Sequence, residues 1–210
     1  MTNLTSLPSR TEGFERRIRP ATADDLPTLA YVLGSALHDD PVWSWTAPDP
    51  RRRRAHLGPL TELLAASVQR GGGNHLNESG TGAAVWAPPG AGLPRHDDGR
   101  FAAALAAATG ADAGRTARLL ELLDANHPTG VPHYYLMLHG VIPERQGHGI
   151  GSSLLRATLE RADRERQPAY LQATSRRSRR LYERHGFVTI GELTTPGCPP
   201  IHAMWRAPRT

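Results

Sequence analysis

The 210-residue chain contains one cysteine, Cys198, and no lysine. A single cysteine excludes an intrachain disulfide, and the missing lysine means that all 25 side chains counted as Lys or Arg are arginines. No apolar run reaches the roughly 20 residues of a membrane-spanning helix, and the N-terminus lacks a hydrophobic signal segment. We therefore predict a cytoplasmic protein without a membrane partner. The Ala-, Gly-, Pro- and Arg-rich composition is typical of a GC-rich bacterial genome.

The formal net charge of +5 favours anionic partners. The arginine run 51–54 lacks the interleaved aromatic residues of many nucleic-acid-binding surfaces, and the second run, 176–180, is expected to be a solvated helix face. A phosphate-bearing small molecule accounts for the charge equally well, and we expect no nucleic-acid partner. The 10 histidines show neither the H-x-x-x-H nor the Cys/His spacing of metal ligands, which predicts no metal site.

Hydrophobic periodicity predicts a flexible tail over residues 1–13 and one mixed domain over residues 14–210. Thr22 and Asp25 are spaced as a capping box at the start of a helix, and Pro59 predicts a kink or break in another. The segment 39–50, with two tryptophans, reads as a loop and 88–100 as a surface loop. Helices are expected over 22–39, 51–70, 101–110, 114–127, 150–166 and 176–185. Strands are expected over 14–22, 75–78, 82–89, 133–142, 169–174, 186–194 and 200–206.

The order of these elements predicts an α/β (or α+β) fold in a single domain. Strand 133–142, helix 150–166 and strand 169–174 form a βαβ unit, whose two strands should be parallel. The segment 82–89 and the strand before it should form an antiparallel pair, because a short turn joins them.

Three glycines, Gly147, Gly149 and Gly151, lie between the central strand and the following helix. The first turn of a helix has free N–H groups, and the helix dipole adds about half a positive charge there. This position therefore suits a pyrophosphate. The dinucleotide fingerprint G-x-G-x-x-G fails because its third glycine falls on Ser152, and the nucleotide-triphosphate loop fails because the chain has no lysine.

The segment 141–155 reads V-x-P-x-x-Q-G-x-G-I-G-x-x-L-L and resembles the acetyl-CoA-binding loop of GNAT-type N-acetyltransferases. This resemblance implies a GNAT-like domain with a mixed, mostly antiparallel central sheet that is splayed at the acetyl-CoA strand and flanked by helices. It also implies acetyl-CoA as co-substrate and allows a homodimer. The implied cofactor-binding residues are Val141, Ile142, Gln146, Gly147, His148, Gly149, Ile150, Gly151 and Ser152.

A second segment, 175–187, resembles the later N-x-x-A-x-x-L-Y-x-x-x-G-F motif of the same family. Tyr182 then faces the acetyl thioester. Ser175 and Ser178, which stand where the family often has Asn and Ala, join the cofactor-binding set. The segments 25–41, 82–90, 141–155, 169–175 and 181–187 resemble, more narrowly, puromycin N-acetyltransferase and its actinobacterial relatives.

The family resemblance implies direct attack of an amine on the thioester. We expect the N–H of Val141 to stabilise the carbonyl oxygen and Tyr182 to donate to the leaving thiolate. His139 should share a face with Val141 and is the candidate base, or else a strand histidine bonded to backbone. Tyr135, further back on the strand, could relay a proton through water. His133, Glu78 and a water-mediated base stay open as alternatives.

The acceptor site is expected between the early helices. Asp39 and Asp40 would attract a cationic amine, and Trp43 and Trp45 would stack on it. Together with Tyr135 they form the predicted substrate-binding set. The alternative is that Asp40 belongs to a turn and that the tryptophans pack the helices onto the sheet.

The leading hypothesis is an N-acetyltransferase that acts on a primary amine of a small molecule, such as an antibiotic or other secondary metabolite. The alternatives are a protein lysine or N-terminal acetyltransferase, a non-catalytic acyl-CoA-binding sensor, and a basic nucleic-acid binder.

Overall fold

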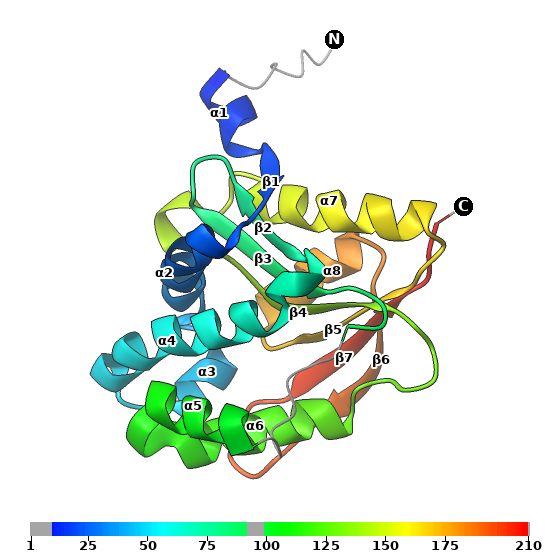
Figure 1. The fold of residues 1–210 in the computed structure, drawn as a ribbon. Coiled ribbons are helices and arrows are strands. Elements are labelled where there is room, and N and C mark those ends of the chain that lie inside the picture. The colour runs from blue at the N-terminus through cyan, green and yellow to red at the C-terminus, as the bar shows by residue number, and fades with distance from the viewer. Residues whose placement is uncertain (1–9, 92–98, 210) are drawn as a thin grey trace, which may run out of the picture.

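A seven-stranded sheet organises the chain in the computed structural model, which describes residues 10–91 and 99–209 (Figure 1). The strand order is β1-β2-β3-β4-β5-β7-β6, and β4 and β5 form the parallel pair while the other neighbours are antiparallel. This confirms the mixed, mostly antiparallel sheet expected from the sequence. The strands are β1 (Ile18–Pro20), β2 (Asn74–Asn77), β3 (Gly82–Ala87), β4 (Tyr134–Val141), β5 (Ala169–Ala173), β6 (Val188–Leu193) and β7 (Ile201–Arg206).

Helices cover both faces of the sheet (Figure 1). Helix α7 lies along one face together with α8, and helices α2, α4, α5 and α6 lie on the other. The α-helices are α1 (Arg10–Glu15), α2 (Leu26–Leu37), α3 (Pro41–Thr46), α4 (Pro50–Val68), α5 (Gly99–Thr109), α6 (Ala113–Ala125), α7 (Ile150–Arg164) and α8 (Arg176–Arg184). Short 3-10 turns are η1 (Ala23–Asp25), η2 (Gln69–Gly71), η3 (Gly110–Asp112) and η4 (Pro143–Arg145).

Three local expectations were wrong. Helix α1 (Arg10–Glu15) includes residues 14 and 15, which we expected in a strand; the flexible tail over 1–13 stays a prediction, and residues 1–9 lie outside the described part. Residues 41–46 form α3 rather than a loop, because the side chain of Asp40 accepts hydrogen bonds from the N–H groups of Val42 and Trp43. Helix α4 runs from Pro50 to Val68 through Pro59 without the break that the sequence suggested.

The expected capping box of Thr22 and Asp25 is present. It caps the 3-10 turn η1, which leads into α2 at Leu26, and the N–H of Thr22 donates to Asp25 Oδ2 over 2.8 Å. We expected a surface loop over residues 88–100. Residues 92–98 of this segment lie outside the described part. Within residues 10–91 and 99–209, no helix is both long enough and apolar enough to cross a membrane.

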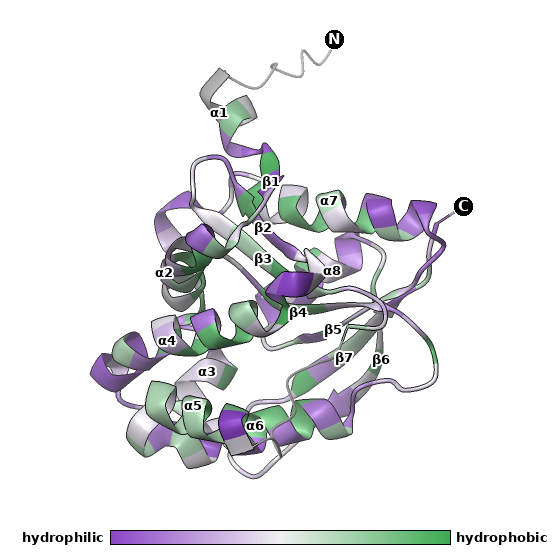
Figure 2. Ribbon diagram, viewed as in Figure 1, coloured by the Kyte–Doolittle hydropathy of each residue, from purple (hydrophilic) through white to green (hydrophobic). Residues whose placement is uncertain are grey.

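Two hydrophobic clusters fill the two faces of the sheet. One joins α2, α4 and α6 to the sheet, and the other joins α7 and α8 to it. Figure 2 shows hydrophobic residues in the central strands and a mixture of hydrophobic and hydrophilic turns along α7. Glycines allow close helix approach on both faces: a Cβ on Gly82 would lie 2.5 Å from Ile150 of α7, and one on Gly140 would lie 2.5 Å from Ala36 of α2.

A β-bulge interrupts the pairing of β3 with β4. Val85 pairs with Leu138 and Trp86 with Leu136, so Met137 is an extra residue on β4. A bulge exchanges the faces of all residues beyond it. Consequently Leu136 belongs to the α7 cluster, whereas Leu138 belongs to the α2 cluster.

Strand β4 separates from β5 directly at this bulge. The parallel register ends with the pair Leu136–Leu171, while Gln172 and Ala173 continue to pair with β7. The sheet is therefore splayed at β4, as the family resemblance implies.

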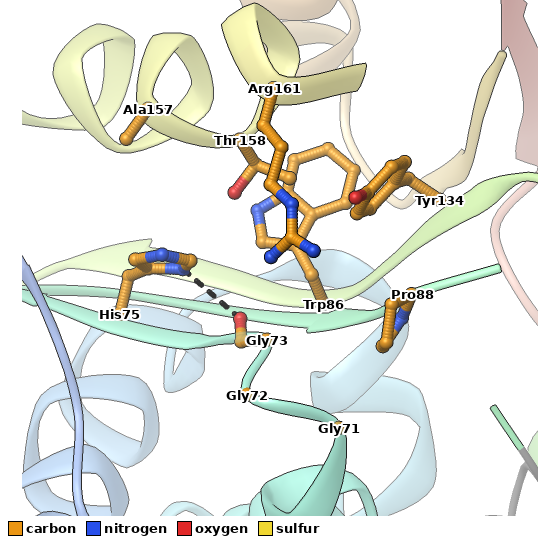
Figure 3. Close-up of a pocket in the computed structure, with 10 residues that line it drawn as sticks. All are labelled: Gly71, Gly72, Gly73, His75, Trp86, Pro88, Tyr134, Ala157, Thr158 and Arg161. Carbon is orange, nitrogen blue, oxygen red and sulfur yellow. Dashed lines mark hydrogen bonds between the residues drawn. The ribbon is translucent and has the colours of Figure 1, made fainter. Parts of the chain in front are cut away.

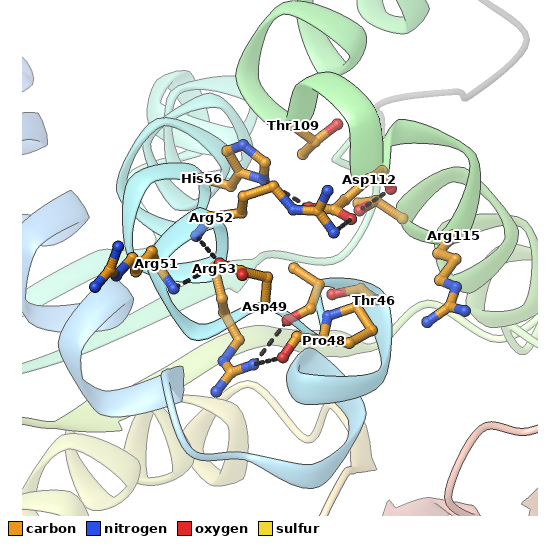
Figure 4. A network of polar contacts seen from close by, with 12 residues as sticks. Thr46, Pro48, Asp49, Arg51, Arg52, Arg53, His56, Thr109, Asp112 and Arg115 are labelled. Carbon is orange, nitrogen blue, oxygen red and sulfur yellow. Dashed lines mark hydrogen bonds and ion pairs between the residues drawn. The ribbon is translucent and has the colours of Figure 1, made fainter.

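A polar network fastens the α5–α6 segment to the start of α4 (Figure 4). The Asp112 carboxylate is buried and lies 3.2 Å from both Arg52 Nη2 and His56 Nδ1. Nearby, Asp49 caps α4, and the buried Arg53 donates to the carbonyls of His38 and Ala47. These contacts set the position of α3, which lies between α2 and α4 in the chain.

We predict that Gly82→Ala lowers the free energy of unfolding by about 1–3 kcal/mol, because its Cβ overlaps the buried Ile150 side chain. Urea denaturation measures this change. Gly114→Ala is the control, since a Cβ there meets nothing within 4 Å; it should leave stability unchanged or raise it by up to about 1 kcal/mol. Equal stabilities of the two variants would contradict the close packing of α7 on β3.

Candidate active site

The glycine loop brings free N–H groups to the start of α7. Gly147 and Gly149 have φ values of 86° and 83°, which only glycine adopts readily. Gly149 is the N-cap of α7 and provides no side-chain acceptor. The N–H groups of the first turn, Ile150 to Ser152, are thus available to an anion, and the 15-residue helix adds its dipole.

Side chains of this loop brace the loop itself. Gln146 Nε2 donates to the carbonyl of Val141 over 3.0 Å, and His148 Nδ1 lies 3.0 Å from the carbonyl of Gln146. Ile150 is buried in the α7 cluster, and Ile142 packs against the α2 cluster. The loop residues that the sequence singled out therefore offer mainly backbone to a ligand.

Gly151 has a different role from the other two glycines. A Cβ at this position would lie 3.3 Å from Cε1 of His139 and 3.6 Å from Leu181. The glycine lets the His139 ring approach the first turn of α7. Glycine is therefore suited to position 151 because it leaves room for the His139 ring, and not because of a positive φ.

The N–H of Val141 points into the gap between β4 and β5. Ile142 N–H donates to Thr81 on the β3 side over 2.9 Å. Neighbouring residues of a strand direct their N–H groups to opposite sides, so the Val141 N–H faces the side from which β5 has separated. This orientation agrees with the role predicted for it.

His139 and Tyr182 face each other on the α7 side of the sheet. His139 Nε2 lies 3.2 Å from the carbonyl of Gly151, and Nδ1 lies 3.5 Å from the Tyr182 hydroxyl. A carbonyl only accepts hydrogen bonds, so Nε2 carries the proton and Nδ1 offers a lone pair to Tyr182. His139 is thus bonded to backbone, which was the alternative to its role as base.

Burial sets the protonation of both groups. Burial lowers the pKa of His139 to about 4, although the bond to Gly151 opposes this shift. Burial, and next the Asp40 carboxylate, raise the pKa of Tyr182. At neutral pH the imidazole is therefore uncharged and the phenol keeps its proton, which leaves Tyr182 able to act as a donor.

Asp40 connects the early helices to the end of β5. Its Oδ2 accepts a 2.6 Å hydrogen bond from Thr174, 134 residues away in the chain, while Oδ1 caps α3. Burial raises the pKa of Asp40, and hydrogen bonds from Thr174 and from the α3 backbone lower it. Burial and then Asp40 raise the pKa of Cys198, so the carboxylate acts electrostatically on both Tyr182 and the β6–β7 loop.

The side chains of the other predicted acceptor residues differ from Asp40 in their surroundings. The Asp39 side chain is 88% exposed, and Trp43 is buried in the α2 cluster. Trp45 is half-buried; its carbonyl accepts from Arg115, and its ring lies against Gly197. Trp43 therefore serves to pack the helices onto the sheet. Trp45, in contrast, lies next to the β6–β7 loop.

Tyr135 does not share a face with His139, contrary to our expectation. The bulge at Met137 turns Tyr135 to the α6 side, where its hydroxyl donates to Gln172 over 2.7 Å and its ring contacts His127. His133 belongs to the same aromatic group, 3.1 Å from His127 between the Nε2 atoms. A period-two strand pattern cannot reveal this exchange of faces.

Three further candidates are placed as follows. Ser175 and Ser178 form a capping box at the start of α8, each backbone N–H donating to the other's hydroxyl over 3.2 Å. Their hydroxyls are thus engaged in holding the helix that carries Tyr182. Glu78 is exposed on the β2–β3 turn, away from the gap.

Sequence reasoning missed Thr174 and Arg16. Thr174 follows β5 and bonds to Asp40, and Arg16 Nε donates to the carbonyl of His148 in the glycine loop over 3.0 Å. No local pattern identifies either residue, because each contact joins segments more than a hundred residues apart.

A separate small cavity of about 30 Å³ lies beneath the C-terminal half of α7 (Figure 3). Trp86 Nε1 and Thr158 Oγ1 line it and have no hydrogen-bond partner among the described residues. It has room for about two water molecules, and none of the predicted site residues lines it. In the part of the chain that the structure describes, no three His, Cys, Asp or Glu side chains are grouped so that they could hold a metal ion.

Comparisons with known proteins agree with this geometry. Residues 102–189 match the family model of the acetyltransferase (GNAT) domain. A histone acetyltransferase HPA2-related acetyltransferase from Corynebacterium glutamicum is 30% identical, with a TM-score of 0.66 over 92% of this chain and 97% of that one.

Two solved structures with lower identity share the fold. They are arylalkylamine N-acetyltransferase 2 from Aedes aegypti (16% identity, TM-score 0.65, 92% of this chain and 99% of that one) and a Drosophila melanogaster polyamine N-acetyltransferase that forms N-acetylagmatine (18%, 0.64, 90% and 98%).

We predict that the folded protein loses stability as the pH falls below about 6.5, the pKa of an unfolded histidine. Burial holds the pKa of His139 at about 4. Between these values the unfolded chain binds a proton that the folded chain does not, so the stabilisation is fully present above this range and is lost on acidification.

Urea denaturation at about pH 7 and about pH 5 should show a decrease of about 1–2 kcal/mol in the free energy of unfolding from this residue. His139→Asn should reduce the decrease, while His127, whose pKa is also about 4, still contributes in both proteins. The same pH dependence in both proteins would contradict a neutral, buried His139.

Proposed function

Because the chain belongs to the GNAT superfamily and is an acetyl-CoA-dependent N-acetyltransferase, we propose that its acceptor is a primary amine of a small molecule, such as an antibiotic or other secondary metabolite. The acetyl group passes directly to the amine. The amine nitrogen attacks the thioester carbon, a C–N bond forms, the C–S bond breaks, and CoA leaves as the thiol.

Acetyl-CoA would lie with its pyrophosphate on the free N–H groups of α7 and its thioester in the gap between β4 and β5. The Val141 N–H would stabilise the carbonyl oxygen. Tyr182, kept protonated by burial, would donate to the thiolate. His139 would hold the Tyr182 hydroxyl in place through Nδ1 and, through Gly151, link it to the cofactor loop.

The half-buried carboxylate of Asp40 is the observation that carries the small-amine proposal. It accepts a hydrogen bond from Thr174, which directly precedes the helix of Tyr182, and it comes from the early helices, where the acceptor should enter. A carboxylate there would attract an ammonium group and accept its proton. Arylalkylamines and agmatine, the acceptors of two structurally similar enzymes, share such a group, which supports this class.

The second candidate function is acetylation of a protein lysine. The 30% identical relative, which is described as related to a histone acetyltransferase, supports it. A peptide needs an open groove, whereas the Asp40 side chain is half-buried at the N-terminus of α3, and this favours the smaller acceptor. The narrower resemblance to puromycin N-acetyltransferase, the cytoplasmic location and the homodimer stay predictions.

The proposal is tested by incubating the protein with acetyl-CoA and a panel of amines at mildly alkaline pH while CoA thiol release is measured. The panel comprises puromycin and other aminonucleosides, aminoglycosides, polyamines, arylalkylamines and lysine peptides. A blank corrects for Cys198. Turnover of one small-molecule class supports the proposal, and turnover of peptides alone supports protein acetylation instead.

With the acceptor that this panel identifies, Tyr182→Phe should lower kcat roughly 100-fold, because the thiolate loses its donor. Binding of acetyl-CoA, measured by calorimetry, should be unchanged. Tyr31→Phe is the matched control, since Tyr31 is 66% exposed on α2. Full activity of the Tyr182 variant, in a protein that binds acetyl-CoA, would favour a different donor.

Asp40→Asn should lower kcat/KM for the amine roughly 100-fold, because the amide neither attracts the ammonium group nor accepts its proton. Asparagine is a good N-cap, so α3 should remain intact. The control is Asp39→Asn, which makes the same change at the exposed neighbouring residue and should alter kcat/KM by less than about twofold. Equal losses in both variants would show that general charge, not this carboxylate, guides the acceptor.

A further inference from the structure

The N-terminal segment reaches the glycine loop and is fixed there by three contacts. Asn77 Nδ2 donates to the carbonyl of Glu15 over 2.8 Å, and the buried Glu15 carboxylate pairs with Arg145 at the edge of the loop. Arg16 Nε donates to the carbonyl of His148 over 3.0 Å. Arg16 is therefore held in position by its own bond to His148 and by the ion pair of its neighbour Glu15 with Arg145.

The guanidinium of Arg16 lies over Gly149, the N-cap of α7. The Cβ position of Gly149 is 3.2 Å from Arg16 Nε and 3.6 Å from Nη2. One N–H group is directed to the His148 carbonyl, and a guanidinium has further donors on its η nitrogens. These donors lie beside the first turn of α7, whose N–H groups are available for an anion.

Arg16 and the neighbouring Arg145 differ in their bonding partners. Arg145 is also next to the loop, but the Glu15 carboxylate neutralises it. Arg16 bonds instead to a carbonyl, and no ion pair of Arg16 is found among the side chains that the structure describes. A guanidinium binds phosphate oxygens strongly because its planar donors match their geometry.

We infer that Arg16 is a cofactor-binding residue that contacts the pyrophosphate of acetyl-CoA and supplies the positive charge that the glycine loop lacks. This inference rests on the proposed function, because it takes the loop as the pyrophosphate site. The pyrophosphate is chosen over the 3′-phosphate because Arg16 contacts His148 and Gly149 in the middle of the loop.

Calorimetry with acetyl-CoA and the full-length protein tests the inference. Arg16→Gln should raise Kd about tenfold, and Arg16→Lys should restore part of the affinity. Arg164→Gln is the control: it removes the same charge from an exposed residue about 20 Å further along α7 and should leave Kd within about twofold. A thermal melt confirms that each variant is folded.

A second ligand identifies the phosphate. Acetyl-dephospho-CoA lacks the 3′-phosphate, so Arg16→Gln should weaken its binding by the same factor as that of acetyl-CoA. Disappearance of the effect with this ligand would assign Arg16 to the 3′-phosphate and overturn the inference. An unchanged Kd in Arg16→Gln would also overturn it while leaving the proposed function intact, whereas failure of the wild-type protein to bind acetyl-CoA would overturn both.

Discussion

The separation of β4 from β5 after Leu136 is the constraint on which the site depends. Hydrogen bonding holds the two strands in register up to Leu136–Leu171, and the extra residue Met137 then adds twist to β4. Beyond this point β5 follows β7 and β4 follows β3. The N–H of Val141 is thereby left facing a gap within an otherwise paired sheet, where a ligand can take the place of a strand.

Helices α2 and α7 pack against the splayed region of the sheet, and His139 connects this region to Tyr182. Glycines under α7 and α2 hold these helices against the two sides of the splayed strand. His139 then joins the first turn of α7 to Tyr182 of α8 through its two ring nitrogens. The loop that would hold the cofactor phosphates and the phenol that would meet the thiolate are therefore parts of one hydrogen-bonded unit.

Charges of opposite sign lie at the two ends of the proposed ligand path. Arg16 adjoins the glycine loop on one side, and on the other the half-buried Asp40 carboxylate bonds to Thr174, which directly precedes the helix of Tyr182. An anionic cofactor and a cationic acceptor would thus be drawn to different ends of the gap. This arrangement explains how a basic chain can contain an anionic acceptor site, because the local field and not the net charge acts on each ligand.

The sequence alone predicted the seven strands, most of the helices, the family and the glycine loop. These features have local patterns: glycines before a helix, apolar residues in the strands, and the Leu181–Tyr182 pair in α8. Each pattern depends on residues that are close together in the sequence. Much of the site's side-chain arrangement could not be predicted in this way. The bulge at Met137 reverses the face of Tyr135 relative to His139, and the Asp40–Thr174 bond joins residues 134 positions apart. Tertiary packing decided these features, because burial and hydrogen bonds between distant segments depend on which segments contact each other. The periodicity of residues within one segment does not specify its contacts with another segment.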